Sequence, residues 1–206
     1  MNVAVFGATG GTGLELVQQA LARGHAVTAF VRDPTRLPAG GDGLTIVTGD
    51  VHDADDVARC VKGQDAVLCA LGSRDLKRTM IRATGTASII DGMKRQGVTR
   101  LIVVSAMGVG ASWNSLSLFN RLLFAAFLGG ARADHEAQEA AVTSSGLDWT
   151  IVRPSGLVDS PGTGVYDVGE GVRAKTSRIP RADVATLILD ELAEGMLVGK
   201  AVTITN

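Results

Sequence analysis

The feature that most constrains this chain is a cluster of glycines directly after its first apolar segment. Residues 3–6 read as a buried strand and residues 14–23 as an amphipathic helix. The turn between them has the spacing G-x-x-G-x-x-G, and its candidate binding residues are Gly7, Thr9, Gly10, Gly11, Thr12 and Gly13. Such glycines permit a tight turn, a close approach of backbone to phosphate, and close packing of helix on strand. Glycines also form ordinary turns, but the strand before and the helix after favour a dinucleotide site whose pyrophosphate faces free N–H groups.

Short β-branched runs alternate with longer amphipathic stretches along the rest of the chain, as in repeated βαβ units. Further strands are expected at residues 26–31, 45–48, 66–70, 101–105, 150–153 and 201–204, and further helices at 53–62, 84–96, 132–145 and 182–194. Right-handed crossovers then give an α/β fold, a doubly wound parallel sheet of the Rossmann type, as a single domain over residues 1–206. Two insertions, residues 108–130 and 159–180, follow strand ends on the carboxyl edge. They are expected to wall a substrate pocket, although loops on that edge can also merely cap the sheet.

The end of the second expected strand distinguishes between the two nicotinamide cofactors. An NAD site usually has an acidic residue there, which holds the 2′-hydroxyl of the ribose. This chain has Arg32 instead, followed by Asp33, and a guanidinium can pair bidentately with a 2′-phosphate. Arg36 is a possible second phosphate partner. The pattern favours NADP(H), while NAD(H) stays possible if the loop turns Asp33 toward the ribose or if Arg32 is only a solvated surface residue.

The carboxyl ends of the later strands supply the other expected cofactor contacts, which are Asp50, Val51, Leu71, Gly72, Ser105 and Pro154. Asp50 could accept a hydrogen bond from the adenine amino group, or it could cap the following helix. Gly72 would let backbone lie against the cofactor. Ser105 and Pro154 end the fifth and sixth strands, on the edge where the nicotinamide should lie.

The proton-donating pair of the classical short-chain dehydrogenases is missing. Those enzymes use Tyr-x-x-x-Lys, whereas the only tyrosine of this chain, Tyr166, is followed four residues later by Glu170. Direct hydride transfer needs no protein acid when the acceptor is a good electron sink such as a flavin or quinone. Ser105 is therefore a candidate for orienting the carboxamide or the acceptor. His135 is a candidate proton donor that would titrate near neutrality, or else a histidine on the helix surface or at a helix cap.

Charge, cysteine usage and hydropathy limit the class of protein further. A formal net charge of −1 argues against a nucleic-acid binder. The two cysteines, Cys60 and Cys69, lie in an expected helix and strand, so core packing is favoured over redox chemistry and a reducing cytoplasm fits. The start of the chain does not read as a signal peptide, no apolar run is long enough for a membrane span, and no ligand cluster indicates a metal site.

The apolar part of the first insertion contains four large aromatic side chains, Trp113, Phe119, Phe124 and Phe127. They could form a lid over an aromatic acceptor, a subunit interface, or simply core. Core packing is the commonest fate of such spacing.

The motifs together resemble the atypical short-chain dehydrogenases/reductases, in the NmrA-like and NAD(P)H-binding branch, and within it the biliverdin reductase B type of NADPH flavin reductases. The matching motifs are FGATGGTG at 6–13, VRD at 31–33, RLP at 36–38, GDV at 49–51, GQDAV at 63–67, LG at 71–72, SA at 105–106, DH at 134–135, SGL at 145–147 and TGVY at 163–166. The resemblance implies NADP(H) bound through the glycine loop and Arg32, with Ser105 near the nicotinamide. It also implies a permissive site for flavins or other flat acceptors, although the apolar insertion at 108–130 departs from the pattern.

Three functions are compatible with these features. The first is an NADPH-dependent reductase that transfers a hydride to a small, flat acceptor of flavin, quinone or tetrapyrrole type, as a monomer or small homo-oligomer. The second is an NmrA-like redox sensor that binds NADP(H) without turnover. The third, an epimerase or dehydratase of nucleotide sugars, is disfavoured by the short carboxyl-terminal region. The reductase is the favoured expectation.

Overall fold

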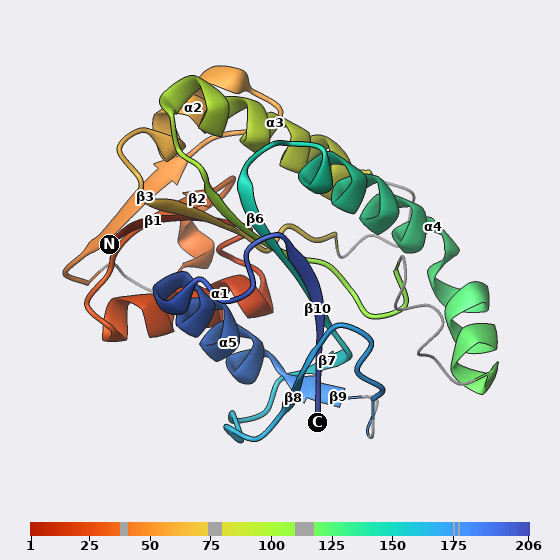
Figure 1. The fold of residues 1–206 in the computed structure, drawn as a ribbon. Coiled ribbons are helices and arrows are strands. Elements are labelled where there is room, and N and C mark those ends of the chain that lie inside the picture. Colours follow the sequence, from red (N-terminus) through yellow and green to blue (C-terminus); the bar gives the residue numbers. More distant parts are fainter. Residues whose placement is uncertain (38–40, 74–79, 110–117, 175, 177) are drawn as a thin grey trace.

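A mostly parallel β-sheet forms the centre of the molecule. The computed structural model describes residues 1–37, 41–73, 80–109, 118–174, 176 and 178–206, with only the backbone of residues 118–130. Over these residues the main sheet has eight strands in the order β3-β2-β1-β4-β5-β6-β10-β8 (Figure 1). Their bounds are β1 (Asn2–Phe6), β2 (Ala26–Val31), β3 (Leu44–Thr48), β4 (Ala66–Cys69), β5 (Arg100–Val104), β6 (Asp148–Pro154), β8 (Asp167–Gly169) and β10 (Lys200–Thr205). The order reverses between β1 and β4, as in doubly wound sheets.

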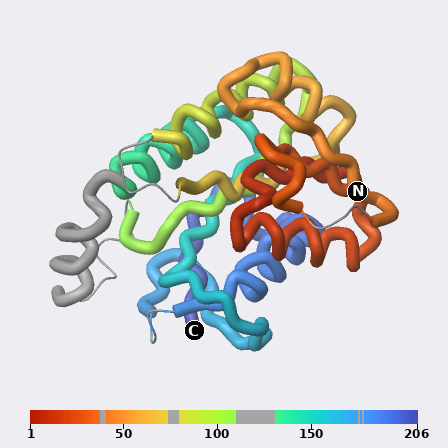
Figure 2. The backbone as a smooth tube through the Cα atoms, turned by 180° about the vertical axis from the view of Figure 1, so that it is seen from behind, coloured from red at the N-terminus to blue at the C-terminus, as the bar shows by residue number. Residues whose placement is uncertain are grey.

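Helices cover both faces of this sheet. On one face lie α1 (Gly11–Ala22) and α5 (Arg181–Glu194), and on the other lie α2 (Ala54–Val61), α3 (Ile81–Gln96) and α4 (Leu118–Thr143) (Figure 1). The view from behind shows the same two layers (Figure 2). A short 3₁₀ helix, η1 (Pro34–Arg36), follows β2. The expected α/β Rossmann architecture is therefore confirmed.

The second insertion is more regular than its glycine content indicates. It contributes β8, which pairs antiparallel with β10 at one edge of the main sheet. It also contributes β9 (Arg178–Pro180), which pairs in parallel with β7 (Gly156–Val158). The sequence pattern predicted no strand within residues 159–180, because both strands depend on pairing with partners distant in sequence.

The first insertion runs into α4, so the helix expected at 132–145 is the second half of a longer one. Trp113 and the side chains of Phe119, Phe124 and Phe127 lie outside the described residues, so their expected role as lid, interface or core stays a prediction. No helix in the described segments combines the length and hydropathy that a bilayer crossing requires.

Two apolar clusters, one on each face of the sheet, form the core. The cluster under α1 and α5 includes Leu16 and Ile188, and the cluster under α2 and α3 includes Phe6. Cys60 and Cys69 lie in the second cluster, at 1% and 0% exposure. Burial raises the pKa of the Cys60 thiol to about 12 and also raises the pKa of Cys69. Both cysteines are therefore unreactive core residues, as expected.

Candidate functional site: a dinucleotide cradle at the sheet's carboxyl edge

The glycine-rich loop joins β1, β4 and α1 so closely that side chains cannot fit. Gly7 has a φ of +78°, and a Cβ atom added to it would be 2.3 Å from the carbonyl oxygen of Ala70, just after β4. A Cβ atom on Gly13 would be 2.1 Å from the carbonyl oxygen of Gly7. Both contacts are with backbone, which cannot swing away as a side chain can. The loop therefore lies at the point where the strand order reverses, the usual ligand site of such sheets.

The first turn of α1 is left open for an anion. Its N-cap residue, Gly10, provides no side-chain hydrogen bond, and the turn contains no acidic residue. Within the described residues, no acceptor bonds the backbone N–H groups of Gly11, Thr12 and Gly13. Unpaired N–H groups and the helix dipole together favour negative charge. The residues of this loop thus fit the pyrophosphate of a dinucleotide, while the contact expected from Thr9 stays a prediction.

The acidic residue in the loop after β2 is occupied by local hydrogen bonds. Asp33 Oδ1 accepts hydrogen bonds from the backbone N and the Oγ1 of Thr35, at 3.0 and 2.6 Å, and thereby caps η1. These two hydrogen bonds lower the pKa of Asp33. Arg32 and Arg36 are exposed, and neither side chain has an ion pair among the described residues. The cations are therefore available to an incoming phosphate.

The ends of β3 and β4 lie on the same edge of the sheet. Asp50 is exposed, and its Oδ1 accepts from the backbone N of His52 at 2.9 Å. The helix that follows is capped by Asp53, which accepts from two backbone N–H groups, so the capping alternative for Asp50 was wrong. Val51 and Leu71 pack against α3 at Gly85. Gly72 is exposed. The cofactor contacts expected from these four residues stay predictions, and the position of the residues at one edge of the sheet is compatible with them.

Ser105, which follows β5, and His135 of α4 lie close together. The backbone N of Ser105 donates to the carbonyl oxygen of Val152 at 2.8 Å, and the N of Met107 donates to that of Pro154 at 2.9 Å. These bonds fix the ends of β5 and β6 together. The hydroxyl of Ser105 is 3.4 Å from Nδ1 of His135, which α4 carries. Both side chains are buried, so the helix-surface alternative for His135 was wrong.

His135 does not titrate near neutrality. Burial, and then the positive charge of Arg82, lower its pKa to about 4, outweighing the opposing effect of Asp134. A neutral imidazole is a poor general acid, so His135 acts here as a hydrogen-bonding group.

The lowered pKa of His135 makes stability depend on pH. The unfolded chain binds this proton below about pH 6.5 and the folded chain only below about pH 4, so stability is full above 6.5 and is lost as pH falls toward 4. We expect the free energy of unfolding to fall by about 2 kcal/mol between pH 7.5 and 5 from this group. Urea unfolding of wild type and His135→Gln at both pH values measures the difference. A pH dependence in His135→Gln equal to that of wild type would contradict the assignment.

Three buried charges around His135 were not identified from the sequence. Asp134 accepts from the backbone N of Arg82 and of Ala83 at 3.2 and 2.8 Å, and from Arg82 Nη1 at 3.1 Å. It therefore caps α3 from another helix, where Met80, with a φ of +45°, provides no side-chain cap. Glu139 forms a buried bidentate ion pair with Arg153. These residues hold α4 in place and so fix the position of His135.

Tyr166 is not part of this arrangement. It packs against the apolar cluster under α1 and α5. Partial burial, followed by the negative charges of Asp190 and Asp183, raises its pKa. A tyrosine beside carboxylates holds its proton firmly, which agrees with the missing Tyr-Lys pair. Among the described residues, no group of three metal-ligating side chains is close enough to hold an ion.

Comparison with known proteins places these features in a family. A family model described as NAD(P)H-binding matches residues 7–195. An uncharacterised chloroplastic protein of Arabidopsis thaliana, At2g34460, is 35% identical over 172 residues, which are 79% of this chain and 61% of that protein. This chain thus spans about three fifths of that relative's length.

Solved structures show the same fold. A short-chain dehydrogenase/reductase from Veillonella parvula in complex with NADP has a TM-score of 0.87 at 20% identity, over 100% of this chain and 94% of that one. ChuY from Escherichia coli CFT073 has a TM-score of 0.79 at 26% identity, over 100% and 96%. ChuY from strain O157:H7, described as an anaerobillin reductase, has 0.82 at 24%, over 100% and 97%. The match to the family model over most of the chain shows that the protein belongs to the NAD(P)H-binding family.

Proposed function

We propose that this protein is an NADPH-dependent reductase that delivers a hydride directly to a small, flat acceptor of flavin, quinone or tetrapyrrole type. The observation that carries the preference for NADPH is the loop after β2, where Asp33 is bonded to Thr35 and Arg32 is free. Bound NADPH would supply the hydride, and the chain supplies binding and orientation.

The chemistry around Ser105 supports an acceptor that needs no protein acid. His135 is neutral at physiological pH and Tyr166 holds its proton firmly. Neither side chain can readily donate a proton to an alkoxide, as reduction of a simple ketone requires. A conjugated acceptor spreads the incoming charge over its rings, so orientation by the Ser105 hydroxyl is sufficient. The likeness to ChuY supports the inclusion of tetrapyrroles in the acceptor class.

Turnover is tested by following the absorbance of NADPH while FMN, a simple quinone and a linear tetrapyrrole are added in turn to the purified protein. We expect oxidation of NADPH with at least one of these acceptors. We also expect Ser105→Ala to reduce the rate by a larger factor than it reduces NADPH affinity, because Ser105 lies away from the glycine-rich loop that is proposed to bind the phosphates. Tight NADPH binding without oxidation by any acceptor would contradict the reductase and favour the redox sensor.

The choice of cofactor is tested at Arg32. Replacing Arg32 by alanine should weaken NADPH binding about 10- to 100-fold, the usual worth of a charged hydrogen bond, and leave NADH binding unchanged. Titration calorimetry with both nucleotides measures the two effects. Arg95→Ala is the matched control, since this exposed arginine lies in the last turn of α3, at the opposite edge of the sheet. An equal loss for NADPH and NADH would show that Arg32 does not recognise the 2′-phosphate.

A further inference from the structure

Arg181, which begins α5, lies over the glycine-rich loop although 170 residues separate it from Gly11. A Cβ atom added to Gly11 would be 2.7 Å from both Cδ and Nε of Arg181, and 3.4 Å from its Cζ. The missing side chain at Gly11 therefore makes room for the arginine. Its cationic group therefore lies beside Gly11, the first residue of α1. Among the described residues, no acceptor bonds the backbone N–H groups of this first turn.

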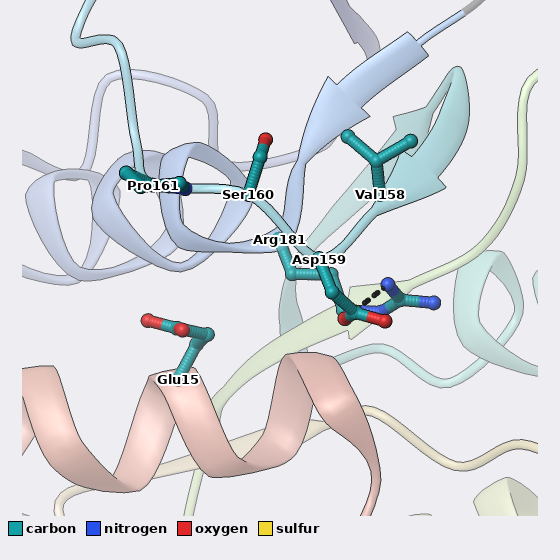
Figure 3. A pocket seen from close by; sticks show the side chains of 6 residues that line it. All are labelled: Glu15, Val158, Asp159, Ser160, Pro161 and Arg181. Atoms are coloured by element: carbon teal, nitrogen blue, oxygen red, sulfur yellow. Dashed lines mark hydrogen bonds and ion pairs between the residues drawn. The ribbon is translucent and has the colours of Figure 1, made fainter.

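The guanidinium of Arg181 forms an ion pair with Asp159. Its Nη1 donates to Asp159 Oδ1 at 2.6 Å, and the side chain of Asp159 is 84% exposed (Figure 3). Both residues line a cavity of about 320 Å³, together with Glu15, Val158, Ser160 and Pro161. Arg181 is the only cation among these six residues, and an ion pair with so exposed a carboxylate contributes about 1 kcal/mol or less. A better anion can therefore displace Asp159.

We infer that Arg181 is a ligand of the cofactor's pyrophosphate and that it exchanges its ion pair with Asp159 for the phosphate oxygens when the dinucleotide binds. This rests on the proposed function, because it assigns a further contact within the same cofactor site. The planar guanidinium matches phosphate oxygens bidentately. It would add a full positive charge to the partial charge of the helix start. The exposed carboxylate of Asp159 then acts as the competitor that eases release.

The test uses a feature that NADPH and NADH share. Both carry a pyrophosphate, so Arg181→Gln should weaken the binding of both by the same factor, about 10- to 100-fold. This pattern differs from that of Arg32→Ala, which should affect NADPH alone. Arg181→Lys keeps the charge but not the planar fork, and should fall between wild type and Arg181→Gln. Titration calorimetry on the full chain gives each affinity, and thermal unfolding shows that each variant is folded.

Arg23→Gln provides the matched control. Arg23 bonds Asp190 of α5 at 2.7 Å, so it also joins α1 to α5 through a surface ion pair, but at the other end of α1. We expect its replacement to leave both affinities unchanged. The assignment would be overturned if Arg181→Gln bound both nucleotides as tightly as wild type does, or if Arg23→Gln lost as much affinity as Arg181→Gln. Arg181 would then have only a structural role between α1 and α5.

Asp159→Asn tests the exchange itself. Removing the competing charge should tighten the binding of both nucleotides about two- to fivefold, the worth of an exposed ion pair. Weaker binding would overturn the exchange, because Asp159 would then be needed to orient Arg181. Failure of the wild type to bind either nucleotide would overturn the proposed function itself. If the wild type binds both nucleotides and Arg181→Gln binds them equally well, this inference alone is overturned.

Discussion

Replacing Glu139 by alanine should lower the free energy of unfolding by about 3–5 kcal/mol, the cost of leaving a buried charge without its partner. Glu139 Oε1 accepts from Arg153 Nε at 2.9 Å, and Oε2 accepts from Nη2 at 2.6 Å. The two side chains are only 8% and 11% exposed, so water cannot replace the lost carboxylate. Urea unfolding of wild type and variant at pH 7 measures the loss.

Two controls separate the buried charge from the loss of a glutamate as such. Glu136 lies one turn earlier on α4 and pairs with Arg132 at 2.7 Å, but both side chains are more than a third exposed. Glu136→Ala should therefore cost about 0.5 kcal/mol or less. The double variant Glu139→Leu with Arg153→Met removes both charges and should recover most of the stability. A double variant as unstable as Glu139→Ala would show that packing, not the unpaired arginine, causes the loss.

The burial of this ion pair depends on packing that the sequence pattern does not predict. Along the chain, Glu136 and Glu139 look alike, because both are acidic residues on one expected helix. Only the position of β6 beneath α4 buries one and leaves the other in solvent. For the same reason His135 was expected to titrate near neutrality, although the charge and burial that lower its pKa come from α3 and the sheet. The position of Arg181 beside Gly11 likewise depends on the packing of α5 against α1.

The residue at which a helix begins can also depend on a contact with a distant segment. The helix expected at residues 84–96 begins at Ile81, because Asp134 of α4 caps it from about 50 residues away. By contrast, Asp53 caps its own helix, and α2 was predicted to within one residue at each end. The strands β8 and β9 were missed because their pairing with β10 and β7 is entirely non-local. Local chemistry is readable from the sequence, whereas contacts between distant segments are not.

The glycine loop is the part of the site that the sequence specified most fully, since its geometry depends on residues within one turn. The spacing of Gly7, Gly10 and Gly13 predicted a tight turn followed by a closely packed helix. The structure shows why two of the three tolerate no side chain, with backbone oxygens 2.3 and 2.1 Å from the added Cβ atoms. At Gly10 the nearest atom would be 3.3 Å away, a contact that a small shift relieves. The three glycines should therefore differ in their tolerance of alanine.

Gly13→Ala should abolish measurable NADPH binding, a loss of at least about 100-fold, and lower the free energy of unfolding by about 3 kcal/mol, the upper end of the usual cost of overpacking. The methyl group can be accommodated only if α1 moves away from the turn at Gly7, and that movement displaces the N–H groups proposed to bind the pyrophosphate. Titration calorimetry with NADPH and urea unfolding measure the two losses.

Gly41→Ala is the matched control, because nothing lies within 4 Å of the added Cβ atom. Gly10→Ala should have an intermediate effect. If Gly13→Ala bound NADPH as wild type does, close packing of helix on strand could not be what holds the pyrophosphate site open.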